Sequence, residues 1–131
     1  MPIINLTAAD RAKNKTIEAK WYPATVKKIS DLKTSKGGDS MNVDITFLIE
    51  TPEIDGKEID RTFNSKAMGM IDPFLSACNN GVEVDLGAID LSKFEGRKID
   101  VKVDIETYEG RLINRVNGFL PLGKGTAGPS F

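Results

Sequence analysis

The chain has 131 residues, of which 40% are hydrophobic and 28% are charged, a balance typical of a folded domain and not of a disordered chain. Its formal net charge of −1 does not by itself predict a polyanion partner, so the placement of the charges matters more than their sum. The sequence contains no histidine. This excludes the usual general base at neutral pH, the commonest metal ligand and the Ser-His and Cys-His nucleophile pairs.

The sequence lacks the features of a membrane or secreted protein. No apolar run approaches the roughly 20 residues that span a bilayer. Residues 1–20 lack the basic and then apolar order of a secretory signal. The single cysteine, Cys78, cannot form an internal disulfide, so we expect a reducing, cytoplasmic setting and no contact with a membrane.

The N-terminal third predicts an arm, a strand and a loop. Residues 1–19 are polar and do not alternate, so we expect a loosely ordered arm. Strand character begins in residues 20–29, where Pro23 indicates an edge or entry position because proline cannot donate to a ladder. Residues 30–40 are rich in turn formers and lysine, which predicts an exposed loop.

The next segment predicts a β-hairpin. Hydrophobic and polar side chains alternate through residues 41–49, a pattern typical of a strand with one buried face. The Asp55-Gly56 pair is the strongest short turn signal, and residues 57–64 form the returning strand.

After Ser65 the pattern becomes helical. Apolar residues recur at helical spacing, and Asn79-Asn80-Gly81 is a helix stop. Because a proline disfavours helix in the residue before it, we expect Pro73 in the first turn of a helix capped by Asp72. Residues 65–71 are then the approach to this helix. Cys78 lies on its apolar face, where an inert buried thiol is expected.

The last third predicts two strands and a tail. Residues 91–97 form a linking turn, and residues 98–105 alternate as a fourth strand. Glu109-Gly110 turns the chain into a fifth strand over residues 111–120. The composition of residues 123–131 is that of a flexible tail.

The predicted order is three strands, one helix and two strands. Because five strands and one helix cannot bury both faces of a flat sheet, we expect the strands to close into a barrel. The order β-β-β-α-β-β is that of the OB fold, in which the helix plugs one mouth of the barrel. We therefore predict an all-β protein with a five-stranded OB-fold barrel over residues 20–122 and flexible termini. An open α+β sandwich of the same elements is the alternative.

Two segments resemble the small bacteriophage single-stranded-DNA-binding proteins. The first is Trp21-Tyr22-Pro23-Ala24-Thr25-Val26 with the Gly-Gly loop and the strand that follow it. The second is Tyr108-Glu109-Gly110-Arg111 with the Asn-Arg-Val-Asn-Gly-Phe-Leu-Pro run of residues 114–121. The resemblance covers roughly residues 20–121. It implies an OB-type fold that binds and protects single-stranded DNA, with little sequence preference, in phage replication or recombination in the host cytoplasm. Replication or recombination proteins are the further partners that it implies.

Such binding needs aromatic faces for the bases and cations along the phosphates. Trp21 and Tyr22 are consecutive, so they face opposite sides of a strand, and the apolar phase places Tyr22 inside and Trp21 outside. Tyr108 lies at a turn that flanks the OB binding face. Phe63 shares a phase with Arg61, although a core position is its alternative. The predicted nucleic-acid-binding residues are Trp21, Lys27, Lys28, Lys33, Lys36, Arg61, Phe63, Tyr108, Arg111 and Arg115.

Other side chains are expected to have structural roles and not to bind a ligand. We predict that Phe47, Phe74 and Phe94 fill the core. Asp100, Lys102 and Asp104 alternate in sign and predict a neutral solvent face.

Catalysis is not expected. The acidic residues are scattered without metal-ligand spacing, and no phosphate-binding loop or nucleophile motif is present. We therefore predict a protein that is not an enzyme and that has no metal or cofactor. RNA is the alternative to DNA as the bound strand. The alternative function is an OB-like protein-protein interaction module that binds a host or replisome protein, which the near-neutral charge favours. The oligomer that the sequence favours is a dimer paired across a two-fold axis at an open sheet edge near Pro23, and the alternative is that the proline prevents this pairing.

Overall fold

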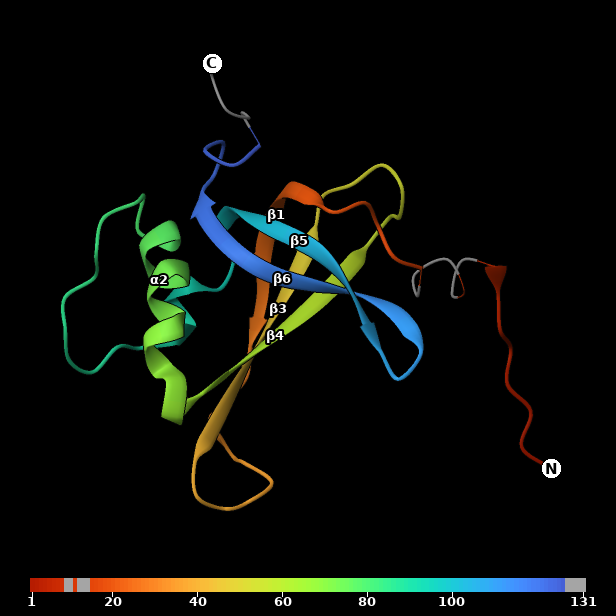
Figure 1. Cartoon of the computed structure of the whole chain (residues 1–131), viewed down its shortest axis with the longest axis horizontal. Helices are drawn as coiled ribbons and strands as arrows, with labels where there is room; N and C mark the ends of the chain where they lie inside the picture. The colour runs from red at the N-terminus through yellow and green to blue at the C-terminus, as the bar shows by residue number, and fades with distance from the viewer. Residues whose placement is uncertain (9–10, 12–14, 127–131) are drawn as a thin grey trace.

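The structure is a computed structural model of the chain, and it describes residues 1–8, 11 and 15–126. Across the described residues a single sheet of six antiparallel strands curls around a core, and the helix α2 covers one end of it (Figure 1). The strands are β1 Lys20–Ile29, β2 Lys33–Thr34, β3 Met41–Ile49, β4 Lys57–Asn64, β5 Lys98–Tyr108 and β6 Arg111–Pro121. The helical elements are the 3-10 helix η1 Ser65–Ile71, α2 Asp72–Cys78 and the 3-10 helix η2 Leu91–Phe94.

The sheet is not closed by backbone pairing. β1 pairs with both β3 and β5, β3 pairs with β4, and β5 pairs with β6. β4 and β6 therefore end the sheet on its two sides, and they lie against each other without a ladder between their described residues. The prediction that the strands close into a barrel is therefore wrong at one place, because no ladder joins β4 to β6. We call the line where β4 faces β6 the seam.

The strand predictions were accurate where the alternation was clean. β1, β3 and β4 have the predicted bounds, and β5 extends three residues past its predicted end, to Tyr108. The predicted edge position of Pro23 is wrong, because β1 pairs with a strand on each side and Pro23 lies opposite Asp100 of β5. The two-residue strand β2 was missed because Lys33 and Thr34 are both exposed and carry no alternation. They pair with Asn42 and Met41 only because the loop folds back along the start of β3.

The helix begins at Asp72, one residue before its proline. Pro73 lies in the first turn of α2, where its missing N–H costs nothing. The predicted cap is wrong, since Asp72 is already helical and the N-cap residue is Ile71, which makes no side-chain cap bond. The helix ends where Asn80 and Gly81 adopt positive φ angles of 58° and 86°, and the N–H of Gly81 donates to the carbonyl of Ser76.

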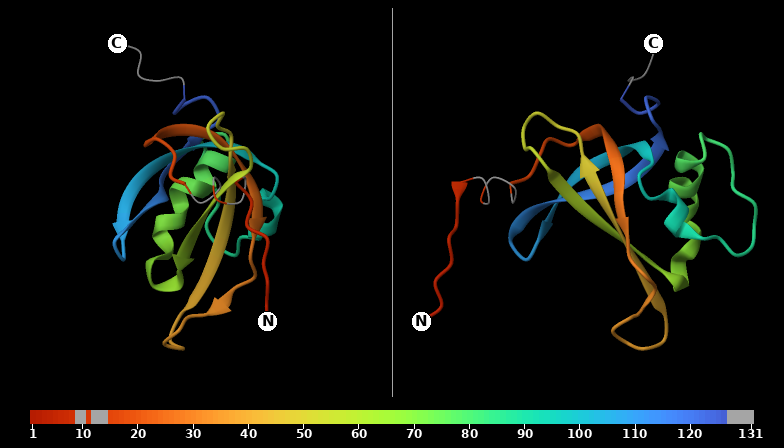
Figure 2. Two further views of the ribbon diagram at one scale, coloured as in Figure 1. Left: turned by 90° about the vertical axis from the view of Figure 1, so that its right-hand side faces the viewer. Right: turned by 180° about the vertical axis from the view of Figure 1, so that it is seen from behind.

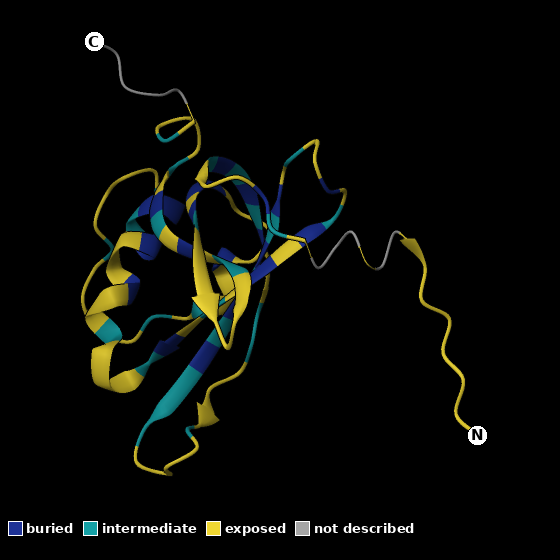
Figure 3. Cartoon of the chain, turned by 45° about the vertical axis from the view of Figure 1, so that its right-hand side comes forward, coloured by how far each residue is buried: buried dark blue, intermediate teal, exposed yellow. Residues whose placement is uncertain are grey.

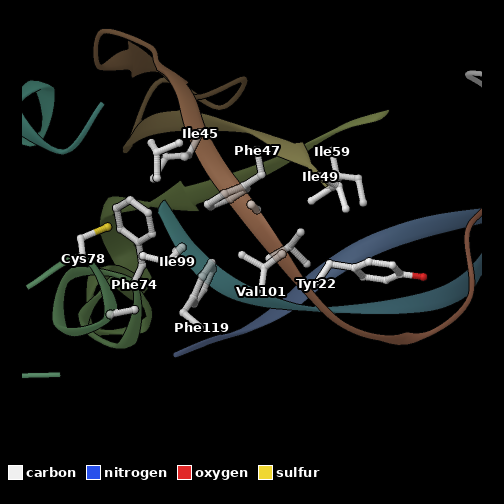
Figure 4. Packing of buried hydrophobic residues seen from close by; sticks show 14 of the residues in the cluster. Tyr22, Ile45, Phe47, Ile49, Ile59, Phe74, Cys78, Ile99, Val101 and Phe119 are labelled. Atoms are coloured by element: carbon white, nitrogen blue, oxygen red, sulfur yellow. The ribbon is translucent and has the colours of Figure 1, made fainter. Parts of the chain in front are cut away.

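The core lies between the inner face of the sheet and α2. The ring of Phe74 on α2 stands edge-on to Phe47 on β3 and to Phe119 on β6, at centroid distances of 5.8 and 5.5 Å (Figure 4). The predicted core positions of Phe47, Phe74, Phe94 and Tyr22 are confirmed, because all four are buried. Buried side chains follow the strands inside the curl, whereas the hairpin tips are exposed (Figure 3). None of the helices among the described residues has the length and apolar character needed to cross a bilayer.

The folded domain begins before Lys20. Ile17 is only 1% exposed and belongs to the core. Its N–H donates to Oδ1 of Asn114 at 2.8 Å, and its carbonyl accepts from Nδ2 of the same side chain at 3.0 Å. The hydroxyl of Tyr22 donates to the carbonyl of Glu18. Residues 15–19, which the sequence assigned to a loose arm, are therefore held on the sheet by Ile17 and these bonds.

The burial of Ile17 gives a test of this boundary. Replacing Ile17 with Ala removes core volume and should lower the free energy of unfolding by about 2–4 kcal/mol. The control Ile4→Ala changes a side chain that is 83% exposed, and it should alter stability by less than about 0.5 kcal/mol. Urea denaturation followed by circular dichroism measures both. Equal stability of the two variants would show that the arm does not belong to the core.

Candidate nucleic-acid interface

Two hairpins project from the same side of the curled sheet. One is the loop of residues 30–40 with the adjoining ends of β2 and β3, and the other is the β5–β6 turn (Figure 2). β4 pairs with β3 on one side and faces β6 on the other, so it lies between the strands that carry these two projections. A hollow of about 330 Å³ opens at the seam beside β4. We call this hollow the seam groove, and it is lined by Asp60, Arg61, Thr62, Glu106, Arg115 and Asn117.

Arg61 joins the two strands that share no ladder. It lies in the inward phase of β4 with Ile59 and Phe63, and its guanidinium sits 5.1 Å from the centroid of the Phe63 ring. Its Nη1 donates to the carbonyl of Val116 on β6 at 2.7 Å and contacts Oδ1 of Asn117 at 3.4 Å. A side chain thus replaces some of the backbone pairing that a closed barrel would have, and the half-buried cation remains at the floor of the groove.

Phe63 is not available for stacking. It is 2% exposed, and its ring packs against Phe74 and Phe119 with centroids 6.4 and 6.2 Å away. The prediction that Phe63 contacts a base is therefore corrected. Ile59, in the same phase, is also buried, so Phe63 takes the core position that was its alternative.

The β5–β6 turn presents an aromatic face beside two cations. Glu109 and Gly110 have φ angles of 47° and 77°, which reverse the chain in two residues. Tyr108, just before them, is 51% exposed. Arg111 pairs with it across the turn, and the guanidinium of Arg115 lies 6.0 Å from the centroid of its ring. The structure therefore brings together three of the residues that the sequence proposed.

The lysines of the residue 30–40 loop and of the end of β1 are partly neutralised. Nζ of Lys33 lies 3.3 Å from a carboxylate oxygen of Asp44, and Nζ of Lys27 lies 3.1 Å from one of Glu58. The hydrogen bond from Thr62, and then the ion pair with Lys33, hold the pKa of Asp44 below its ordinary value. Lys28 and Lys36 are exposed. Within the described residues neither of these two forms an ion pair.

Trp21 lies elsewhere on the outer face. It pairs in register with Lys102 on β5, and six residues separate Lys102 from Tyr108. At roughly 3.3 Å per residue the two aromatic side chains are about 20 Å apart along the strand. Trp21 faces outward as predicted, but it is half-buried and does not join Tyr108 in one site.

The segment after β6 covers Trp21 and Asp100. Asp100 has no exposed surface, so the predicted neutral solvent face is corrected at this residue. Its Oδ2 accepts hydrogen bonds from the N–H of Gly125, the N–H of Thr126 and Oγ1 of Thr126, at 2.8 to 2.9 Å. Nothing in the alternation around Asp100 indicated these partners, because they come from a segment that the sequence reads only as a tail.

The structure offers few groups for covalent or metal chemistry. Cys78 is buried on α2, and burial raises the pKa of its thiol to about 12. Among residues 1–8, 11 and 15–126, no group of three or more acidic or cysteine side chains is placed to hold a metal ion. A scan against models of known protein families and a search of curated proteins each gave no match.

The bridge across the seam can be tested directly. Arg61→Met keeps an apolar stem over Phe63 but removes the donors to β6, so the free energy of unfolding should fall by about 1–3 kcal/mol. The matched control Arg111→Met removes an exposed arginine at the turn and should change it by less than about 0.5 kcal/mol. Chemical denaturation of the two variants gives the comparison. A similar loss in both would mean that Arg61 does not hold the seam.

Proposed function

We propose that the protein binds single-stranded nucleic acid with little sequence preference, and that DNA is the strand it binds. The fold in this proposal is an OB-type barrel whose seam is completed by side chains. Its support is the pairing of β1 with β3 and β5, the antiparallel pairs β3–β4 and β5–β6, and the helix that lies between these pairs in the chain, at one end of the sheet. This is the strand order of the OB fold.

One observation carries the proposal. The hairpin with Tyr108 and the lysine-bearing loop project from the same side of the sheet (Figure 2), and β4 lies between the strands that carry them. In an OB fold the corresponding loops border the face that takes oligonucleotides. An unpaired strand lying across β4 would place a base on Tyr108 and phosphates near Arg111, Arg115 and the loop lysines.

The chemistry of these groups suits a strand without sequence readout. Every base has a π face, so stacking on Tyr108 does not select a sequence. The ion pairs of Lys33 and Arg115 are exposed, and exposed pairs contribute only about 0–1 kcal/mol. Phosphates can therefore replace Asp44 and Glu106 as the partners of these cations at little cost.

The resemblance to phage single-stranded-DNA-binding proteins supports a cellular role. In this role the protein would coat and protect exposed strands in phage replication or recombination, in the cytoplasm of the host. Replication or recombination proteins would be its further partners.

The acidic residues on β4 favour a second candidate, a protein-interaction module. Glu58 and Asp60 are exposed on β4, next to the proposed path of the strand. Carboxylates there repel phosphates and would suit a basic protein surface instead. A pull-down from lysate that survives nuclease treatment, combined with no binding of oligonucleotides, would favour this candidate.

The salt dependence of binding tests the role of the loop lysines. A fluorescently labelled thymidine oligonucleotide should bind with an affinity that falls steeply with salt, measured by anisotropy. In Lys33→Gln/Lys36→Gln the slope of log affinity against log salt should be smaller by about 1.4, because two single-strand phosphate contacts are lost. The control Lys93→Gln/Lys98→Gln removes two cations from η2 and the start of β5 and should keep the slope. Absence of any salt-sensitive binding by the unmodified protein would overturn the proposed function.

The ring of Tyr108 gives a second test. Tyr108→Leu removes the stacking face and should weaken binding of the same oligonucleotide by about 1–3 kcal/mol. Tyr108→Phe keeps the ring and should bind as the unmodified protein does. If both substitutions weaken binding equally, the hydroxyl and not the ring makes the contact.

A further inference from the structure

Trp21 and Asp100 are diagonal neighbours on the outer face of the sheet. Trp21 lies opposite Lys102, and Pro23 lies opposite Asp100. Asp100 is therefore two residues along β5 from the residue opposite Trp21, on the same face of the sheet. Gly118 on β6 makes room for the ring, since a Cβ at that position would lie 3.2 Å from Cη2 of Trp21. This corner lies away from Tyr108, outside the interface described above.

Residues 122–126, which we call the strap, close over this corner. A Cβ on Gly125 would lie 2.5 Å from Cε3 and 2.6 Å from Cδ2 of Trp21, so the backbone of Gly125 is in contact with the indole. The strap thus packs the Cα of Gly125 onto the indole and covers an aromatic surface. An indole surface of this kind is one on which a nucleobase can stack.

Asp100 limits what could replace the strap. Its Oδ2 accepts all three hydrogen bonds from Gly125 and Thr126, and its Oδ1 is buried with no partner among the described residues. Leaving a buried carboxylate without donors is strongly unfavourable. A ligand that displaces the strap must therefore bring a flat ring for Trp21 and adjacent N–H donors for Asp100.

Among the four DNA bases, guanine meets both requirements. It carries N1–H and the 2-amino group side by side on its Watson–Crick edge, which suits the two oxygens of a carboxylate. The amino groups of adenine and cytosine each stand next to a ring-nitrogen acceptor, and the N3–H of thymine stands between two carbonyl oxygens. Each of these three edges would turn an acceptor towards Asp100.

We propose that the ring of Trp21 and the carboxylate of Asp100 form a binding site for an unpaired guanine base, and that the strap covers it. The inference rests on the proposed function, to which it adds a second contact with a base preference. Because the strap competes for the same groups, binding of guanine is weakened by the fraction of molecules in which the strap is closed.

The variant Gly125→Ala opens the strap, because its Cβ has no room beside the ring. The matched control Gly69→Ala places a methyl group where nothing lies within 4 Å. Trp21 is the only tryptophan, so its emission reports the strap directly. In Gly125→Ala the emission should shift to the red and acrylamide should quench it more strongly, whereas Gly69→Ala should match the unmodified protein. Circular dichroism confirms that both variants are folded, and Thr126→Val, which removes one donor without adding bulk, should give a smaller change in the same direction.

Three labelled pentamers then test the ligand by anisotropy. The first is thymidine throughout, the second has a central deoxyguanosine, and the third has a central deoxyinosine, which lacks the 2-amino donor. Gly125→Ala should bind the guanine pentamer about tenfold more tightly than the inosine pentamer. Adding Asp100→Asn should abolish this preference, because an amide offers only one acceptor oxygen.

The outcomes separate this inference from the proposed function. Unchanged quenching in Gly125→Ala and Thr126→Val overturns the strap. Stronger quenching with equal binding of all three pentamers overturns the guanine site but leaves the proposed function standing. If neither the pentamers nor an oligonucleotide of greater length binds to any variant, the proposed function fails and the guanine site fails with it.

Discussion

The contact across the seam determines how the molecule is arranged. β4 and β6 share no ladder, so side chains alone hold the two ends of the sheet together. On the inner side, Phe63 of β4 and Phe119 of β6 pack in one aromatic cluster. At the rim, Arg61 donates to the backbone of β6. These contacts and the rest of the core packing hold the curl of the sheet. The curl sets the positions of the residue 30–40 loop, the β5–β6 turn and the seam groove.

The charges show why a net charge near zero is compatible with the proposed function. Several cations of the candidate interface already face carboxylates, as Lys33 faces Asp44 and Arg115 faces Glu106. Exposed pairs of this kind are weak, so they lower the long-range attraction for a polyanion without preventing close contact. Affinity would then depend more on stacking at Tyr108 than it does in a strongly basic protein.

Much of the fold could be predicted from the sequence, because burial on one face of a strand leaves a period of two residues. β1, β3 and β4 show this period, and their bounds were predicted correctly. The candidate site was less accessible to prediction. Tyr108 and Arg111 flank a turn that Glu109-Gly110 predicts from the sequence. Phe63 and Arg61 share one phase of β4, so alternation cannot tell that Phe63 lies in the core and Arg61 at the rim of the seam; packing decides this. The contacts of Ile17 with Asn114 and of Gly125 with Trp21 join residues far apart in the chain, and no local pattern records them.

The sequence by itself determined the bounds of β1, β3 and β4, the two-residue turn at Glu109-Gly110, the place of Pro73 in the first turn of the helix and the absence of histidine. These properties depend on neighbouring residues and on composition. Only the tertiary structure decided that the sheet stays open between β4 and β6, that Arg61 bridges this seam, and that Asp100 is buried beneath residues 125 and 126. The physical reason is that burial and hydrogen bonding between distant segments depend on how the sheet curls. The curl follows from the packing of the whole core and not from any single stretch of sequence.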